Sequence, residues 1–282
     1  MQAVQRTDPV AYHAEGPVWS ATWGGLRWVD MLAGDILSLG ADGSVHRRHV
    51  ADIAVMVRPR VPGGAVIGIE RGFALEAPDG SLTRLGELWS GDDVRMNEGG
   101  CDPDGRLYCG SMAYDQRPGA GSLYRLDPDG TVTVVLDGVT ISNGLEWSPD
   151  GSLAYYVDTP TRQVSRFDYD TERGLTGRRV FVETGDGPGR PDGLTVDREG
   201  GVWVALFGGS AVNRYTPEGE LDEVVEVPAR QVTACTFGVP GLDELFITTS
   251  AENLDPGDDP RAGSLFSARV GVAGLPVRPF GG

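Results

Sequence analysis

Short runs of alternating apolar and polar residues recur along the whole chain and are separated by turn signals. Alternation with a period of two is typical of half-buried β-strands, and clusters of Asp, Pro and Gly favour tight turns. No long segment has helical periodicity, so the pattern predicts an all-β protein. The clearest predicted strands are Leu26–Asp30, Val66–Ile69, Arg106–Cys109, Leu123–Leu126, Val132–Leu136, Leu153–Val157, Val164–Tyr169, Val202–Leu206 and Leu245–Thr248.

Four polar residues occupy the same phase of a longer repeat. Glu15, Asn97, Asn143 and Asp192 each stand five positions before a Ser or Asp, which a glycine turn and an apolar run then follow. They are separated by steps of 82, 46 and 49 residues. The first step corresponds to about two repeats and each of the other two to one repeat. A four-stranded propeller blade takes about 40–50 residues. The spacing therefore predicts a six-bladed β-propeller with four antiparallel strands per blade.

The two remaining blades are expected near Met56–Arg58 and Thr233, and no linker divides the chain. We therefore expect residues 1–282 to form a single propeller domain. A β-sandwich or an irregular barrel is the alternative, but neither gives a reason for polar residues in phase every 47 residues or so.

Equivalent positions of a propeller converge on its axis, so the in-phase residues predict an oxygen-rich site. Glu15, Asn143 and Asp192 are the candidate metal ligands, and Asn97 either completes the set or faces the substrate. Such oxygens suit one divalent cation, Ca²⁺ first, with Mg²⁺, Mn²⁺, Zn²⁺ and Fe²⁺ also compatible. Asp192 is also the candidate general base. A purely structural ion on the axis is the alternative.

Two further residues are candidates for substrate binding. Arg95 lies two positions before Asn97, and an extended strand places both on one face. Its guanidinium could hold a hydroxyl, carboxylate or phosphate group; a surface salt bridge is the alternative. Asp115, in the loop 114–120, could cover the same mouth, or could be a solvated loop acid.

Composition narrows the class of partner. The net charge of −17 argues against nucleic acids and anionic membranes as partners. The chain contains no lysine, which excludes a lysine Schiff base, and it lacks a GxSxG motif. The three cysteines and three histidines show no zinc-ligand spacing. The first residues lack the apolar core of a signal peptide, so we expect a cytoplasmic protein. With nucleic acids and membranes disfavoured, a small molecule is the expected partner.

Several stretches resemble the regucalcin/gluconolactonase (senescence marker protein-like) family of six-bladed propellers. The matching stretches are Glu15–Trp19, Arg95–Gly99, Asp102–Arg106, Ser142–Ser148, Pro191–Leu194 and the tail Gly263–Phe266 with Gly271–Leu275. Their order and spacing cover nearly the whole chain.

The resemblance implies a role for each candidate residue. Glu15, Asn143 and Asp192 match the metal ligands of the family, and Asp192 also matches its general base. Arg95 and Asn97 match residues that contact a sugar lactone, and Asp115 falls where an acid can touch the substrate. Glu98 stands where Asp is common in the family and Gly100 where a basic residue is common, which predicts a different substrate.

The first hypothesis is therefore a divalent-metal-dependent hydrolase that opens a sugar lactone. The cation would polarise the ring carbonyl, and Asp192 would assist the attack of water. A calcium-binding or regulatory propeller without physiological hydrolysis is the second hypothesis. The third is a propeller enzyme that acts on another ester or a biosynthetic intermediate.

Overall fold

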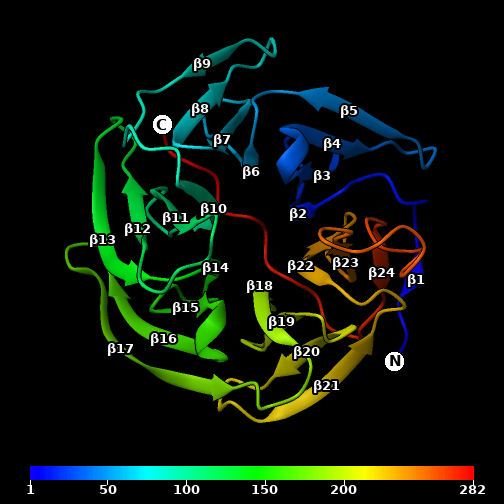
Figure 1. Cartoon of the computed structure of the whole chain (residues 1–282). Coiled ribbons are helices and arrows are strands. Elements are labelled where there is room, and N and C mark those ends of the chain that lie inside the picture. Colours follow the sequence, from blue (N-terminus) through cyan, green and yellow to red (C-terminus); the bar gives the residue numbers. More distant parts are fainter.

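The computed structural model describes residues 1–282, in which 24 strands form six four-stranded antiparallel sheets around a central axis (Figure 1). Each sheet is one blade, and its inner strand faces the axis. The six-bladed propeller expected from the repeat is confirmed. The inner strands of the blades expected near Met56–Arg58 and Thr233 are β6 (Ala54–Pro59) and β22 (Val232–Gly238).

Blades 1 to 5 follow the chain, with the inner strand first. Blade 1 comprises β2 (Ala14–Ser20), β3 (Gly25–Asp30), β4 (Asp35–Leu39) and β5 (Val45–His49). Blade 2 comprises β6, β7 (Ala65–Ile69), β8 (Gly72–Glu76) and β9 (Leu82–Arg84). Blade 3 comprises β10 (Val94–Cys101), β11 (Leu107–Ala113), β12 (Gly121–Leu126) and β13 (Val132–Val139). Blade 4 comprises β14 (Ser142–Trp147), β15 (Leu153–Asp158), β16 (Gln163–Asp170) and β17 (Gly174–Glu183). Blade 5 comprises β18 (Arg190–Val196), β19 (Val202–Phe207), β20 (Ala211–Tyr215) and β21 (Leu221–Glu226).

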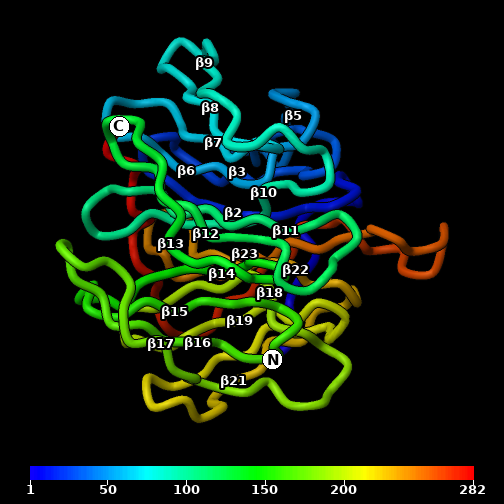
Figure 2. The backbone as a smooth tube through the Cα atoms, turned by 60° about the vertical axis from the view of Figure 1, so that its left-hand side comes forward, coloured from blue at the N-terminus to red at the C-terminus, as the bar shows by residue number.

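Blade 6 is built from both ends of the chain. Its inner strand β22 and the next two strands, β23 (Glu244–Thr249) and β24 (Phe266–Ala268), come from the C-terminal part, and β1 (Val4–Gln5) completes the sheet by pairing with β24. The segment between β23 and β24 projects from the ring (Figure 2). The N-terminal strand is too short to give a periodic signal, and the sequence did not predict it.

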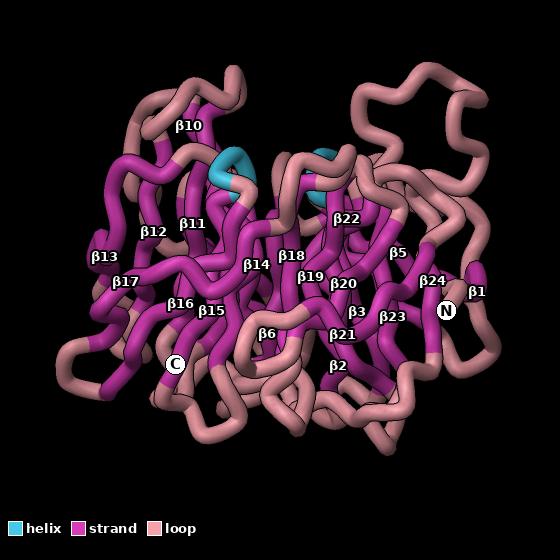
Figure 3. Tube along the Cα trace, turned by 90° about the horizontal axis from the view of Figure 1, so that it is seen from below, coloured by secondary structure: helices cyan, strands magenta, loops and turns pink.

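Two short 3₁₀ helices are the only helical elements, η1 (Met31–Ala33) and η2 (Thr159–Thr161). They follow the second strands of blades 1 and 4, and both lie at the same face of the propeller (Figure 3). No helix has the length and apolar character needed to cross a membrane.

The core lies between neighbouring blades, as expected for stacked sheets with apolar faces. The largest apolar cluster joins blades 1, 2 and 3 and includes Val29, Met56, Phe73 and Met96. All three cysteines are buried free thiols.

The inner strands share a β-bulge near their beginning. The pairing register shifts between Met96 and Gly99 in β10, between Ser142 and Leu145 in β14, and at the corresponding place in the other four inner strands. A bulge redirects side chains and is common beside functional sites. The in-phase residues therefore lie within the inner strands, at or beside this bulge. The apolar run that follows each of them in the sequence indicated that they precede the inner strand, but that run is the second strand of the blade.

Glycines after two in-phase residues let the inner strands approach closely. A Cβ atom on Gly144 would stand 2.6 Å from the backbone nitrogen of Leu194 in the next blade. On Gly193 it would stand 2.4 Å from the Cβ of Ala234. Asn143-Gly144 and Asp192-Gly193 are therefore close packing contacts around the axis, although the dipeptides alone resemble turns.

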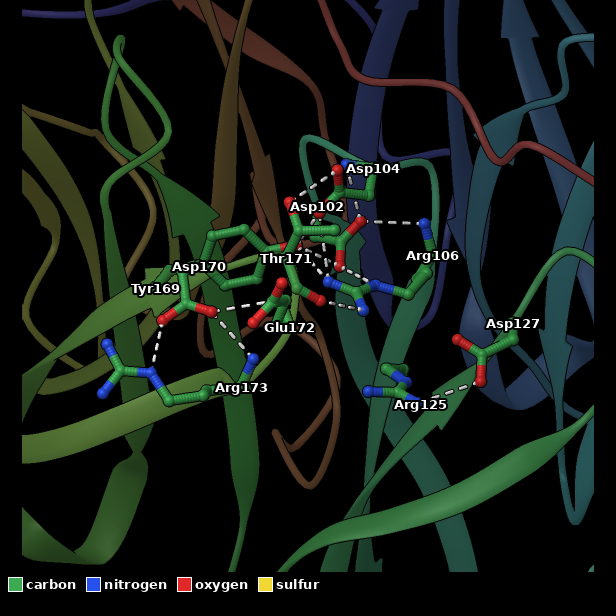
Figure 4. A network of polar contacts seen from close by, with 10 residues as sticks. All are labelled: Asp102, Asp104, Arg106, Arg125, Asp127, Tyr169, Asp170, Thr171, Glu172 and Arg173. Carbon is green, nitrogen blue, oxygen red and sulfur yellow. Dashed lines mark hydrogen bonds and ion pairs between the residues drawn. The ribbon is translucent and has the colours of Figure 1, made fainter.

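The Ser or Asp five positions after each in-phase residue caps the turn that follows the inner strand. Asp102 Oδ1 accepts bonds from the backbone nitrogens of Asp104 and Arg106 at 2.9 and 2.8 Å. Its Oδ2 accepts a bond from Arg106 Nε and lies 2.6 Å from the hydroxyl of Tyr169 in blade 4 (Figure 4). Arg106 also donates to the carbonyl of Thr171. This network joins blades 3 and 4.

The C-terminal tail crosses the end of the axis where the inner strands finish, and it is the red segment in Figure 1. It donates or accepts backbone or side-chain hydrogen bonds with five blades, at Leu242, Arg198, Glu146, Gly105 and Pro59. Phe280, near its end, is buried in the core of blades 1 to 3. The tail therefore closes one end of the axis, and the in-phase residues stand at the other.

Candidate functional site

A cavity of about 550 Å³ opens at the face that carries the beginnings of the inner strands and the two helices. Glu15, Asn97, Asn143 and Asp192 all line it, one from each of blades 1, 3, 4 and 5. Each of the four is at most 5 % exposed. The repeat phase therefore brings these residues to one place.

Hydrogen bonds connect three blades through this layer. Asn97 Nδ2 donates to the Ser142 carbonyl at 2.8 Å and to Asn143 Oδ1 at 3.0 Å. Asn143 Nδ2 donates to Thr159 Oγ1 at 2.8 Å, and Thr159 Oγ1 donates to the Pro191 carbonyl, also at 2.8 Å. The amide groups are thus held on both sides, which fixes the direction of their oxygens.

The two carboxyl groups of the site form no ion pair, although Arg95 attracts Glu15 from a greater distance. Burial raises the pKa of Glu15 well above its usual value, and repulsion from Asp192 raises it further. Burial also raises the pKa of Asp192, with repulsion from Glu98 and Glu252 adding to it and the Asn143 amide opposing it. No ion pair in the structure involves Glu15 or Asp192. Buried carboxylates are stable when a cation neutralises them.

The donor set fits a hard divalent cation. The site differs from a cluster of His, Cys, Asp and Glu ligands, because no group of three or more of these side chains is arranged to hold a metal ion. The oxygens at the axis belong to two carboxylates and the Asn143 amide, a mixture that Ca²⁺ and similar cations accept. Two negative charges would balance one such ion.

Arg95 lies above this layer, buried and directed at Asn97. Its Nη1 donates to Asn97 Oδ1 at 2.6 Å and to the Met96 carbonyl at 2.9 Å. It forms no ion pair, so the surface salt bridge considered as its alternative role does not occur. The cavity also contains His13, whose pKa is lowered to about 3 by burial and by Arg95. A neutral imidazole is therefore present at this rim, hydrogen-bonded to Ser250 at 2.7 Å.

Asp115 is placed differently from the other candidates. Its side chain is 62 % exposed, pairs with Arg117 at 3.1 Å and does not line the cavity. From the same loop region, Tyr114 and Gln116 do line it. The expected contact between Asp115 and a substrate is therefore not supported by its position.

The two departures at Glu98 and Gly100 also lie away from this cavity. Glu98 lines a small cavity of about 30 Å³ farther along the axis, 3.6 Å from Arg58. A Cβ atom on Gly100 would stand 2.6 Å from the Leu145 carbonyl oxygen, so packing explains the glycine. Neither residue lines the larger cavity, so the expectation of a different substrate is not explained by a direct contact from either of them.

The sequence did not single out several other residues that line the cavity. Thr159 and Glu252 gave no pattern, because each lies in an irregular segment that follows a second strand. Arg190 did carry a signal, since it stands two positions before Asp192, as Arg95 does before Asn97. The set comprises Leu32, Met112, Tyr114, Gln116, Ile141, Thr159, Arg190, Phe207 and Glu252.

Comparison with known proteins agrees with this geometry. A model of the SMP-30/gluconolactonase/LRE-like region matches residues 13–251. The chain belongs to the SMP-30/gluconolactonase/LRE-like family. Among its relatives, pentonolactonase XacC from Haloferax volcanii is 35 % identical in sequence, over 98 % of this chain and 97 % of that protein. Regucalcin from Danio rerio is 34 % identical, over 95 % and 94 %.

Solved structures of the SMP-30/gluconolactonase/LRE-like family have the same fold. The calcium-binding protein regucalcin from Agrobacterium tumefaciens superposes with a TM-score of 0.92 and 29 % identity, covering 99 % of this chain and 97 % of that one. The match includes the four blades that supply the in-phase residues.

Proposed function

We propose that the protein is a divalent-metal-dependent hydrolase that opens a sugar lactone. The observation that carries the proposal is the pair of buried carboxyl groups, Glu15 and Asp192, which share a cavity and form no ion pair. The names of relatives add support, because one of them is called a pentonolactonase and another a calcium-binding regucalcin.

Glu15, Asn143 and Asp192 would hold the cation. When bound, a divalent ion supplies Lewis-acid polarisation of the lactone carbonyl and lowers the pKa of an adjacent water molecule. Ca²⁺ is the first candidate, and Mg²⁺, Mn²⁺, Zn²⁺ and Fe²⁺ also accept oxygen ligands.

Asp192 is the proposed general base, because it lines the cavity beside the Asn143 amide, which lowers the pKa of this carboxyl group against the effect of burial. It would take one proton from the water molecule that attacks the carbonyl carbon. The ring C–O bond then breaks, and the proton is delivered to the ring oxygen, so that the product is a hydroxy acid.

Arg95 and Asn97 would orient the substrate. The hydrogen bond from Arg95 to Asn97 fixes both side chains, and the remaining N–H groups of the guanidinium are free to donate to substrate oxygens. The short helices bring Leu32 and Thr159 to the rim and limit the space around the ring.

A panel of sugar 1,4- and 1,5-lactones tests the proposal. Proton release would be followed by pH-stat, with metal-depleted protein and after addition of each divalent cation in turn. We expect turnover of at least one lactone that depends on the cation. Binding of Ca²⁺ without turnover of any lactone would instead favour a regulatory calcium-binding propeller.

A further inference from the structure

The residues two positions before the four in-phase residues form a second layer of the same cavity. His13, Arg95, Ile141 and Arg190 all line it, from blades 1, 3, 4 and 5. Residues at positions i and i+2 of an extended strand point to the same side. The repeat therefore places a ring of side chains above the proposed cation ligands, and two members of the ring are arginines.

Neither arginine of this ring has an acidic partner. Arg95 and Arg190 form no ion pair, and the Arg190 side chain forms no hydrogen bond either. The rest of the molecule is different, since most of its arginines pair with acids, and acidic residues outnumber basic ones by 41 to 24. Arg95 and Arg190 differ from the other arginines without an ion pair because they line one cavity, where their guanidinium groups can donate to a ligand.

The remaining charges of the cavity do not fully neutralise these arginines. Glu15 and Asp192 are assigned to the cation, whose two positive charges they balance. Glu252 is the third acid in the cavity. It lies 3.4 Å from the neutral His13 and attracts Arg95, so it balances one of the two guanidinium charges. With the cation bound, the arginines therefore give the cavity a net positive charge, which favours an anionic ligand.

The positions of the two arginines separate their roles. Arg95 is 5 % exposed and is bonded to Asn97, next to the proposed reaction centre. Arg190 is exposed, at the beginning of β18 and beside Phe207 on β19. It therefore reaches the outer part of a bound substrate, away from the ring carbonyl. A guanidinium group binds carboxylate and phosphate oxygens with two parallel hydrogen bonds.

We propose that the preferred substrate is a lactone that carries an anionic group, a carboxylate or a phosphate, on the carbon farthest from the ring carbonyl, and that Arg190 binds this group. The inference rests on the proposed lactonase function and adds the substrate class. Arg190 is a specificity-determining residue, and it takes no part in proton transfer or carbonyl polarisation.

Matched substrates test this proposal. A neutral six-carbon aldono-1,4-lactone would be compared with the aldaric acid monolactone of the same ring, in which a carboxylate replaces the terminal hydroxymethyl group, and with the 6-phosphorylated aldonolactone. We expect the wild type to favour one anionic lactone at least tenfold in kcat/KM. Comparing kcat/KM for the carboxylate-bearing and the phosphate-bearing lactone shows which of the two anionic groups is bound.

The variants would be Arg190→Gln and Arg190→Lys. For Arg190→Gln we expect the ratio of anionic to neutral kcat/KM to fall about tenfold, mainly through KM, with partial recovery in Arg190→Lys. Arg198→Gln is the matched control, because Arg198 is exposed in a turn of the same blade, its side chain has no partner, and it lies outside the cavity. We expect Arg198→Gln to leave the ratio unchanged.

Some outcomes would overturn the proposal. A wild type that prefers the neutral lactone would do so, as would an Arg190→Gln variant that loses activity equally on all lactones. If no lactone of any charge is turned over with any cation, the lactonase function itself fails. Calorimetry then still tests Arg190, because the dicarboxylate aldarate should bind the wild type at least tenfold more tightly than Arg190→Gln. Equal binding would overturn the role of Arg190.

Discussion

Asn97 in blade 3 donates a hydrogen bond to Asn143 in blade 4 across 3.0 Å, between residues that the sequence places 46 positions apart. The bond connects two members of the repeat directly. It also orients the Asn143 oxygen, which is a proposed cation ligand. The pair therefore links Arg95, the proposed substrate-orienting residue, on one side with the proposed cation site on the other.

Replacing Asn97 by Ala should weaken both the proposed orientation of the substrate through Arg95 and the orientation of the Asn143 oxygen. We expect kcat/KM for a lactone to fall about tenfold to a hundredfold, because the buried partners of Asn97 are left without a hydrogen bond, which costs about 1–3 kcal/mol. Steady-state kinetics with saturating cation measures the effect. Asn213→Ala is the control, since Asn213 lies on β20 outside the cavity. A kcat/KM within twofold of the wild type for Asn97→Ala would contradict the assigned role.

Asp192→Asn should remove the proposed base while keeping the size of the side chain. We expect kcat to fall about 10²- to 10⁴-fold, the usual contribution of a positioned general base. Single-turnover kinetics under saturating cation measures this, and circular dichroism confirms that the variant is folded. Asp186→Asn changes an exposed turn and serves as control. Full activity in Asp192→Asn would refute the mechanism.

Glu98 should make the stability of the protein depend on pH. Burial raises its pKa from 4.5 to about 6, although Arg58 opposes the shift. The folded state therefore binds the proton more tightly, so the stabilisation present below pH 4.5 is lost as the pH rises to about 6. The loss is about 2 kcal/mol at 1.36 kcal/mol per pKa unit.

The Glu98→Gln variant lacks this titration. Its free energy of unfolding, compared with that of the wild type, should rise by about 2 kcal/mol between pH 4.5 and pH 7. Urea denaturation over this range measures the difference, and Glu218→Gln controls for the loss of one exposed carboxylate. A difference that stays constant with pH would show that Glu98 does not titrate in this way.

Asp197 should contribute to stability and not to catalysis. Its Oδ1 accepts two backbone bonds at 2.9 Å, and its Oδ2 accepts bonds from Trp203 Nε1 and Arg214 Nε at 2.8 Å. Asp197→Ala leaves Arg214 partly buried with fewer partners, so we expect a loss of about 3–5 kcal/mol in the free energy of unfolding.

The control for Asp197 is its neighbour Glu199, which also pairs with Arg214 but is 71 % exposed. Glu199→Gln should cost less than about 1 kcal/mol, as exposed ion pairs usually do. Chemical denaturation compares the two variants. Equal losses would mean that burial of Asp197 does not determine its contribution.

The repeat was sufficient to predict the architecture, because each blade repeats one order of polar residue, turn and strand. Glu15, Asn97, Asn143 and Asp192 could be found from this phase alone, and Arg95 from its place on the same strand face. The closing strand Val4–Gln5 could not, since two residues give no periodicity and their pairing with β24 depends on the ring being complete.

Irregular segments account for most of what the sequence did not predict in the cavity. Glu252 and Thr159 enter from a loop and a short helix, where no period fixes the direction of a side chain. Asp115 shows the opposite error, because sequence proximity to the site did not reveal that its side chain turns outward to Arg117. Glu98 follows Asn97 directly, but the bulge in β10 directs it to the other cavity.

A crystal structure of the protein grown with Mn²⁺, with an anomalous difference map, tests the central claim most directly. We predict one strong peak within about 2.0–2.6 Å of carboxylate oxygens of Glu15 and Asp192 and of Asn143 Oδ1, the range of divalent cation–oxygen distances. A map without a peak among these three oxygens, from protein that still opens lactones after exhaustive chelation, would contradict the account.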